Sequence, residues 1–159
     1  WLSRNRQSSL RQNLFKKNNI TLAIAESCTG GEIASRLTKI PGSSDYFLGS
    51  ITAYNSSVKK EILGVDEQLI KTHSVVSKEV SKEMALKVRE KFSSTYGVST
   101  TGTAGPSLGD SKEKIGTVYI TISKEDNIIT EKFNFGNHRE RIILKTVNKV
   151  FEMLIKVIQ

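Results

Sequence analysis

The chain has little of several residue types that indicate particular classes of protein. It contains one cysteine and two histidines, which excludes an internal disulfide framework and disfavours a zinc site built from protein ligands alone. The single thiol fits a reducing compartment, so we expect a cytoplasmic protein. With so few cysteines and histidines, we expect no metal. No apolar run is long enough to cross a bilayer, and the first residues contain no apolar signal core, so we expect no membrane partner.

The composition is also short of acidic residues and of aromatic rings. Asp and Glu number 16 against 24 Lys and Arg, for a formal charge of +8, and aromatic residues make up 7% of the chain. A basic surface can serve nucleic acid, anionic membranes or phosphorylated metabolites. The lysines are scattered and the aromatic residues are not interleaved with arginine, so a base-stacking platform is poorly supported. We interpret the charge as a solubilising surface and expect no nucleic-acid partner.

The length of 159 residues fits one domain, and we expect residues 1–159 to form it, with residues 1–18 containing an N-terminal helix. Hydrophobic periodicity predicts helices over residues 3–18, 29–39, 56–63 and 77–91 and from near 139 onward. It predicts strands over residues 21–25, 47–54 and 96–101, and a hairpin of 115–123 with 128–135. This order predicts a three-layer α/β/α sandwich with a mixed, mostly parallel sheet of about five strands and one antiparallel strand from the hairpin.

Ligands of open α/β sheets bind beyond the carboxyl ends of the strands. Three segments of this chain are expected there, namely residues 26–31, 54–59 and 102–110. The start of the last helix, at Arg139, is expected to come near them. The site is therefore expected at this edge of the sheet.

The segment Ala25–Gly31 reads Ala-Glu-Ser-Cys-Thr-Gly-Gly and joins an expected strand to an expected helix. Unpaired N–H groups and the helix dipole favour negative charge there, so the turn could bind an anionic ligand or an oxyanion of acyl transfer. Ser27 and Cys28 are rival nucleophiles, and adjacent residues on a turn point in different directions. We favour a buried Cys28, because a small free cysteine usually fills a core.

A serine nucleophile needs a base, because its hydroxyl is almost never ionised at neutral pH. His73 and His138 lie in expected turns, where solvated side chains are the simpler interpretation, and the chain lacks a Gly-x-Ser-x-Gly elbow. A lysine replaces histidine in Ser-Lys hydrolases, and Lys59 lies just past the second expected strand. Its pKa would have to fall from about 10.4 toward 7–8. From periodicity alone, Lys59 is an ordinary surface lysine beside Lys60.

Small and polar residues at the other strand ends are candidates to bind a substrate. The segment Gly102–Pro106 suits a ring or a phosphate, although it is equally typical of a tight connection. Arg139 opposes the dipole at the start of a helix, and a bound phosphate would account for it. The candidates for substrate binding are Thr29, Gly30, Gly31, Tyr54, Thr101, Gly102, Ala104, Gly105 and Arg139.

These segments together resemble the C-terminal domain of the competence/damage-inducible CinA proteins. The hallmark is Ala25–Gly31, and the resemblance covers about Leu10 to Ile158. Further matching pieces are residues 41–44, 53–59, 63–65, 102–106 and 116–119. Because the family includes stand-alone amidases, the resemblance implies an amidohydrolase that needs no metal or cofactor. Its implied reaction converts nicotinamide mononucleotide to nicotinate mononucleotide and ammonia, within pyridine-nucleotide salvage. It further implies that Ser27 attacks and that Lys59 is the base.

The sequence departs from the family pattern in three places. Ser56 stands where the family commonly has Asn, residues 74–77 replace a Gly-Ala-Val-Ser segment, and the approach to the last helix, residues 136–139, is one residue longer. These changes affect substrate contacts and leave Ser27 and Lys59 untouched. The alternatives are a non-catalytic nucleotide-binding module and, from the net charge, a nucleic-acid binder. The sequence leaves open whether the protein forms a homo-oligomer. Because the chain begins at Trp1, it also leaves open a preceding domain in a longer parent chain. The resemblance implies that such a domain would be similar to molybdopterin-binding proteins.

Overall fold

The computed structural model describes residues 13–159, and the statements below concern those residues. The expected N-terminal helix over 3–18 is seen in part: residues 13–17 are helical, and the Phe15 side chain is fully buried. The earlier part of that prediction, including Leu10, lies outside the described residues.

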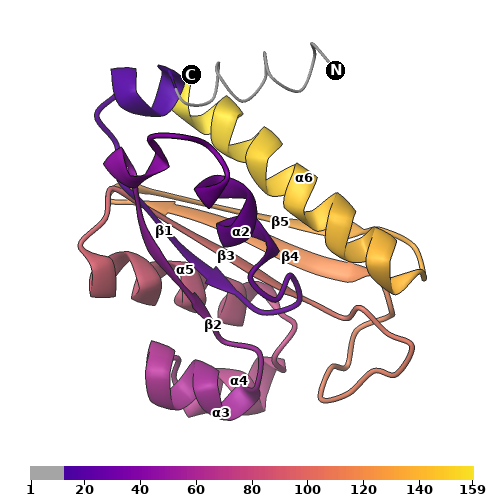
Figure 1. Cartoon of the computed structure of the whole chain (residues 1–159). Helices are drawn as coiled ribbons and strands as arrows, with labels where there is room; N and C mark the ends of the chain where they lie inside the picture. The colour runs from indigo at the N-terminus through magenta and orange to yellow at the C-terminus, as the bar shows by residue number, and fades with distance from the viewer. Residues whose placement is uncertain (1–12) are drawn as a thin grey trace.

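Five strands form one mixed sheet in the order β2-β1-β3-β4-β5 (Figure 1). They are β1 (Leu22–Glu26), β2 (Phe47–Thr52), β3 (Tyr96–Gly102), β4 (Thr117–Lys124) and β5 (Asn127–Asn134). Strand β1 pairs in parallel with β2 and β3, whereas β4 is antiparallel to both β3 and β5. Four strands therefore share one direction and β4 opposes them, which confirms the predicted sheet.

Helices cover both faces of this sheet, so the predicted three-layer sandwich is also confirmed (Figure 1). One face carries α2 (Glu32–Thr38) and α6 (Arg139–Ile158), and the other carries α3 (Ser56–Val58), a π-helical turn (Lys59–Leu63), α4 (Glu67–His73) and α5 (Lys78–Phe92). A short 3-10 helix, Ser43–Asp45, precedes β2.

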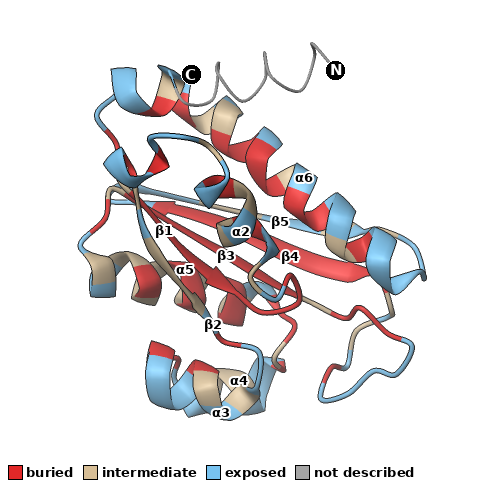
Figure 2. Ribbon diagram, in the orientation of Figure 1, coloured by how far each residue is buried: buried red, intermediate tan, exposed pale blue. Residues whose placement is uncertain are grey.

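The alternation of side chains along β1 builds the two hydrophobic cores. Leu22 and Ile24 belong to the cluster that includes Phe151 of α6, whereas Ala23 and Ala25 belong to the cluster that includes Met84 of α5. Successive residues of a strand point to opposite faces, so one strand serves both layers. All five β1 residues are buried, as Figure 2 shows for the centre of the sheet.

The structure differs from the sequence-based expectation at two helices. The helix expected over 29–39 begins only at Glu32, because Gly30 and Gly31 have φ of 59° and 99° and form a turn first. The helix α4 was not predicted. It is seven residues long and has no fully buried residue, so its periodic signal is weak, although Asp66 caps it by accepting a hydrogen bond from the Gln68 N–H.

Helix α5 packs unusually close to β3 at Gly97. A Cβ atom at this position would lie 2.3 Å from the Ala85 carbonyl oxygen and 2.6 Å from the Arg89 Cβ. Both contacts are with the helix itself, so any side chain here must push α5 away from the sheet.

We therefore expect Gly97→Ala to lower the free energy of unfolding by about 2–3 kcal/mol, because adding a methyl group to a fully packed core destabilises a protein by about this amount. Urea denaturation followed by circular dichroism measures it. The control is Gly109→Ala, where a Cβ would meet no atom within 4 Å and only the left-handed backbone, φ 56°, opposes it. Its expected cost is about 1 kcal/mol. An equal or smaller loss for Gly97→Ala would contradict the packing argument.

Candidate active site

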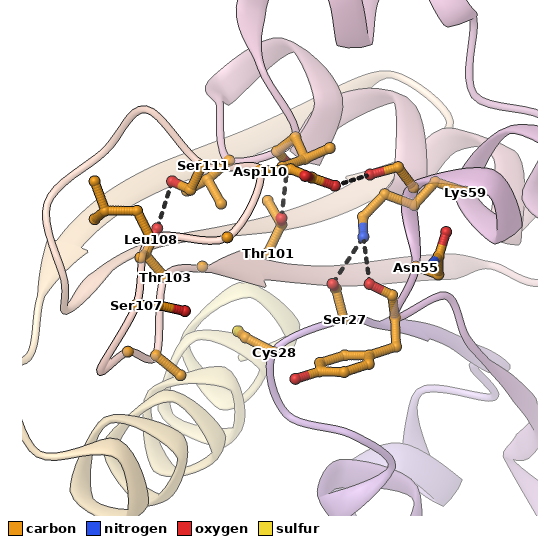
Figure 3. A pocket seen from close by; sticks show the side chains of 18 of the residues that line it. Ser27, Cys28, Asn55, Lys59, Thr101, Thr103, Ser107, Leu108, Asp110 and Ser111 are labelled. Atoms are coloured by element: carbon orange, nitrogen blue, oxygen red, sulfur yellow. Dashed lines mark hydrogen bonds between the residues drawn. The ribbon is translucent and has the colours of Figure 1, made fainter.

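A cavity of about 270 Å³ opens at the carboxyl ends of β1 and β3 (Figure 3). Its wall comes from the turn after β1, the start of α3, the loop that follows β3 and the first residue of α6. The lining residues are Ser27, Cys28, Tyr54, Asn55, Ser56, Lys59, Val75, Val76, Thr101, Gly102, Thr103, Ala104, Gly105, Ser107, Leu108, Gly109, Asp110, Ser111 and Arg139. All three segments expected at this edge therefore contribute to one cavity.

Ser27 and Lys59 meet in this cavity. The Lys59 Nζ lies 2.9 Å from the Ser27 Oγ, 2.8 Å from the Ala53 carbonyl oxygen and 3.2 Å from the Tyr54 carbonyl oxygen. Lys59 is 2% exposed, and Ser27 is 6% exposed. Figure 3 shows the amine aimed at the serine from the neighbouring segment. Periodicity alone favoured a surface lysine at this position, and that expectation is wrong, because the Lys59 side chain is buried.

Burial lowers the pKa of Lys59 to about 8, because the desolvated ammonium is disfavoured relative to the neutral amine. The negative charge of Asp110 acts in the opposite direction and raises it, and Cys28 would do so only as a thiolate. A neutral amine has two N–H donors and one lone pair. The two carbonyl oxygens, of Ala53 and Tyr54, can accept the two donors, which leaves the lone pair for the hydroxyl proton of Ser27. The arrangement therefore suits a general base.

Backbone hydrogen bonds place both side chains. The Ser27 N–H donates to the Thr100 carbonyl oxygen at 3.1 Å, and the Ala53 N–H donates to that of Glu26 at 2.7 Å, so the ends of three strands are tied together. Asn55 then caps α3 by accepting from the Ser57 N–H at 2.9 Å. The helix then widens into the π-helical turn that begins at Lys59, a form that is frequent at functional sites.

Glu26 is a fully buried carboxylate that holds the turn between β1 and α2. It accepts hydrogen bonds from the Thr29 hydroxyl at 2.6 Å and from the N–H groups of Ile33 and Ala34 at 2.9 and 3.1 Å. The N–H groups that begin α2 are thus satisfied by the protein's own anion. The anion site expected from the helix N-terminus is taken by Glu26.

The three neighbouring candidates, Thr29, Gly30 and Gly31, do not line the cavity. The Thr29 hydroxyl is bound to Glu26, and the Gly30 N–H donates to the Ser27 carbonyl oxygen at 3.1 Å. The expectation that they contact substrate is therefore not met by the geometry. Sequence adjacency suggested it, but only Ser27 and Cys28 of this turn line the cavity.

Cys28 lines the cavity but is buried, as its small size suggested. Burial raises the pKa of its thiol to about 12, so the thiol stays protonated at neutral pH. Its Sγ lies against Gly102, where an added Cβ would come within 3.2 Å of it. Cys28 therefore packs the base of the cavity and is not poised as a nucleophile.

The mouth of the cavity is bridged by Arg139. Its guanidinium donates to the Gly105 carbonyl oxygen and, at 2.9 Å, to the Tyr54 hydroxyl, although Tyr54 is 60% exposed. Thr101 is buried and donates to the Val75 carbonyl oxygen at 2.8 Å. The structure thus brings six of the nine binding candidates to the cavity, namely Tyr54, Thr101, Gly102, Ala104, Gly105 and Arg139.

Sequence reasoning missed several residues of the wall, chiefly the tip of the loop after β3. Ser107, Leu108, Asp110 and Ser111 belong to it. The loop folds back because the Thr103 hydroxyl donates to the Ser111 hydroxyl at 2.5 Å. The expected loop 102–110 was a signal for this region, but nothing in it indicated which side chains face inward.

Neither histidine lines the cavity, and no metal centre is formed by residues 13–159. His73 ends α4 and lies 3.6 Å from Glu79, and His138 precedes α6. No group of three or more His, Cys, Asp or Glu side chains in that range could hold a metal ion. No helix within it is long and apolar enough to cross a membrane.

Comparison with known proteins places this geometry in a family. The model of the CinA C-terminal domain matches residues 5–158. A CinA-like protein of Flavobacterium psychrophilum is 44% identical over 90% of this chain, and one of Prochlorococcus marinus is 46% identical over 80% of it. Those matches cover 34% and 30% of the two relatives, so the chain spans about a third of their length.

Solved structures of proteins from the same family have a fold similar to that of this chain. The crystal structure of the competence/damage inducible protein CihA from Agrobacterium tumefaciens matches with a TM-score of 0.89 and 30% identity over 96% of both chains. A competence-damaged protein (CinA) superfamily protein from Escherichia coli matches with a TM-score of 0.88 and 27% identity, over 95% of this chain and 87% of that one. The buried serine and lysine thus sit in a known domain, and the chain belongs to the CinA C-terminal domain family.

Proposed function

We propose that this domain is a serine amidohydrolase that converts nicotinamide mononucleotide to nicotinate mononucleotide and ammonia. The observation that carries the proposal is the 2.9 Å contact between the Lys59 amine and the Ser27 hydroxyl, both buried at the base of an open cavity. The resemblance to amidases of the CinA family supplies the substrate. The names of the relatives state the family and no activity.

The chemistry follows from the protonation state of Lys59. The neutral amine takes the Ser27 proton, and the Ser27 Oγ attacks the carboxamide carbon to form a tetrahedral oxyanion. Collapse of this intermediate breaks the C–N bond, and the Lys59 ammonium returns its proton to the departing ammonia. Lys59 then takes a proton from a water molecule, and the resulting hydroxide attacks the acyl-serine ester. The ester C–O bond breaks, the Lys59 ammonium returns the proton to the Ser27 Oγ, and the carboxylate product leaves.

The oxyanion needs N–H donors that are not already used. The Cys28 N–H follows the nucleophile directly and donates to no other residue within 13–159. The Ala104 N–H on the cavity wall likewise has no acceptor among those residues. We infer that these two groups bind the oxyanion, a role that the sequence suggested for the turn within Ala25–Gly31.

The rest of the nucleotide fits the mouth. Arg139 supplies the cationic end of the cavity and suits a phosphate, and the exposed ring of Tyr54 beside it suits the pyridine or the ribose. Thr101, Gly102 and Gly105 line the wall between them. The single thiol agrees with a reducing cytoplasm as the site of this reaction.

If the pair acts as a unit, Ser27→Ala and Lys59→Ala should each lower kcat/KM for nicotinamide mononucleotide by at least about 1,000-fold, and the double variant should lose little more. Ammonia release measured with purified protein tests this.

Lys60→Ala is the matched control, because Lys60 is the adjacent lysine and forms an exposed ion pair with Glu67 at 3.2 Å. It should retain activity. Binding of the nucleotide without ammonia release by the wild-type protein would instead favour the non-catalytic module.

The rate should depend on pH through Lys59. Because the base must be neutral and its pKa is lowered to about 8, we expect kcat/KM to rise with pH to a plateau above about 8. A profile that is flat between pH 6.5 and 9.5 would remove Lys59 as the base.

Stability should depend on the same group. In the folded protein the pKa of Lys59 is about 8, below its ordinary 10.5, so the unfolded chain holds one more proton between these values and stability rises with pH there. Below pH 8 the fold must bury the charged amine. Relative to Lys59→Met, the wild type should gain on the order of 2–3 kcal/mol between pH 7.5 and 10. Urea denaturation of both proteins at the two pH values measures the difference, and a constant difference would contradict it.

A further inference from the structure

Among residues 13–159, Asp110 is the one carboxylate on the cavity wall. The other ionisable groups that line it are Cys28, Tyr54, Lys59 and Arg139. Cys28 keeps its proton, and Lys59 is neutral when it acts as a base. In the reacting state, therefore, the wall carries one negative charge, at Asp110, and one positive charge, at Arg139.

Two hydrogen bonds hold Asp110 beside the reacting pair. Its Oδ2 accepts from the Ser56 hydroxyl at 3.2 Å (Figure 3). Its backbone carbonyl oxygen accepts from the Ser74 hydroxyl at 3.4 Å. Ser56 begins α3, one turn before Lys59. The tip of the loop is thus tied to the helix that carries the base, and the carboxylate stays near the end of the cavity where the carboxamide must react.

Arg139 occupies a different part of the wall. It is the first residue of α6 and contacts Gly105 and Tyr54, whereas Asp110 contacts Ser56 and Ser74. The cavity is therefore dipolar, with separate places for an anionic and a cationic group of one ligand. Charges arranged in this way discriminate among ligands of the same shape.

We propose that Asp110 is a specificity-determining residue that selects substrates whose carboxamide-bearing ring is positively charged, an N-ribosylated pyridinium, over the same nucleotide with a neutral ring. The inference rests on the proposed function, because it concerns the ring next to the scissile amide. Nicotinamide mononucleotide has a quaternary ring nitrogen and a phosphate, so its two charges match Asp110 and Arg139.

The Asp110 carboxylate also offsets the effect of a cationic ring on the protonation of Lys59. A cationic ring near Lys59 favours the neutral amine, which then has less tendency to carry the proton from Ser27 to the leaving ammonia. The groups that face Lys59 are Ser27 and Cys28 from the turn after β1 and Asp110 from the loop, together with the carbonyl groups of residues 53 and 54. Asp110 is the anion among them, and it raises the pKa of Lys59.

The test compares nicotinamide mononucleotide with its reduced form, whose dihydropyridine ring is uncharged and whose ribose phosphate is the same. The quantity is the ratio of kcat/KM for the cationic and neutral substrates, in the wild type and in Asp110→Asn. We expect the substitution to reduce this ratio about tenfold, a value typical of one partly solvated charge pair. The midpoint of the pH–rate profile should also shift downward.

Two further variants separate charge from geometry. Ser56→Ala removes the hydrogen bond and keeps the carboxylate, so the ratio should stay within about twofold of the wild type. Asp110→Glu keeps the charge and should restore most of the preference. A ratio that falls equally in Ser56→Ala and Asp110→Asn would assign Asp110 a loop-holding role and overturn the proposal.

Binding to Ser27→Ala, measured by titration calorimetry, makes the inference independent of turnover. There the preference for the cationic nucleotide should again fall about tenfold when Asp110→Asn is added. If wild type releases ammonia from nicotinamide mononucleotide and Asp110→Asn leaves both ratios unchanged, the specificity role fails and the proposed function stands. If wild type releases no ammonia, the proposed function fails and the binding ratio still decides the role of Asp110. Binding of neither nucleotide overturns both.

Discussion

The hydrogen bond between the Lys59 amine and the Ser27 hydroxyl depends on the whole edge of the sheet. The serine is held because its N–H pairs with β3, and the amine is held because two carbonyl groups at the end of β2 receive it. An ammonium in this place is desolvated, so the fold bears a free-energy cost that disappears only when the amine is neutral. A purely structural lysine would be more stable at the surface, so this burial supports the proposed role of Lys59 as a base.

The two carboxylates nearest to Ser27 and Lys59 in sequence or in space, Glu26 and Asp110, do not form a salt bridge with the Lys59 amine within residues 13–159. Glu26 directly precedes Ser27 and is fully buried, yet its carboxylate accepts hydrogen bonds from the Thr29 hydroxyl and two N–H groups of α2. It neither pairs with Lys59 nor lines the cavity. Had it formed a salt bridge with the amine, the pKa of Lys59 would rise and the amine would be less able to act as the proposed base. The anion that does face the cavity, Asp110, is exposed, and its influence is moderated by solvent.

Much of the fold could be predicted because its signals are local. The period-two pattern of the hairpin and the stripe of α5, with Val80, Met84 and Val88 buried, correspond to the elements found. Helix α4 was missed because it buries no side chain completely and so lacks a strong period. The late start of α2 depends on the left-handed turn at Gly30 and Gly31 and on the Glu26 carboxylate, which no helix propensity encodes.

The sequence by itself determined the order of elements, and with it the place of Ser27, Lys59 and residues 102–110 at one edge of a mixed sheet. Only the tertiary structure decided that Lys59 is buried while Lys60 remains at the surface, that residues 29–31 turn away from the cavity, and that Asp110 joins its wall. The reason is physical. Strand order follows from hydrophobic patterns within short windows, whereas desolvation, pKa and the direction of a side chain depend on groups far away in sequence, here 32 residues apart for the reacting pair.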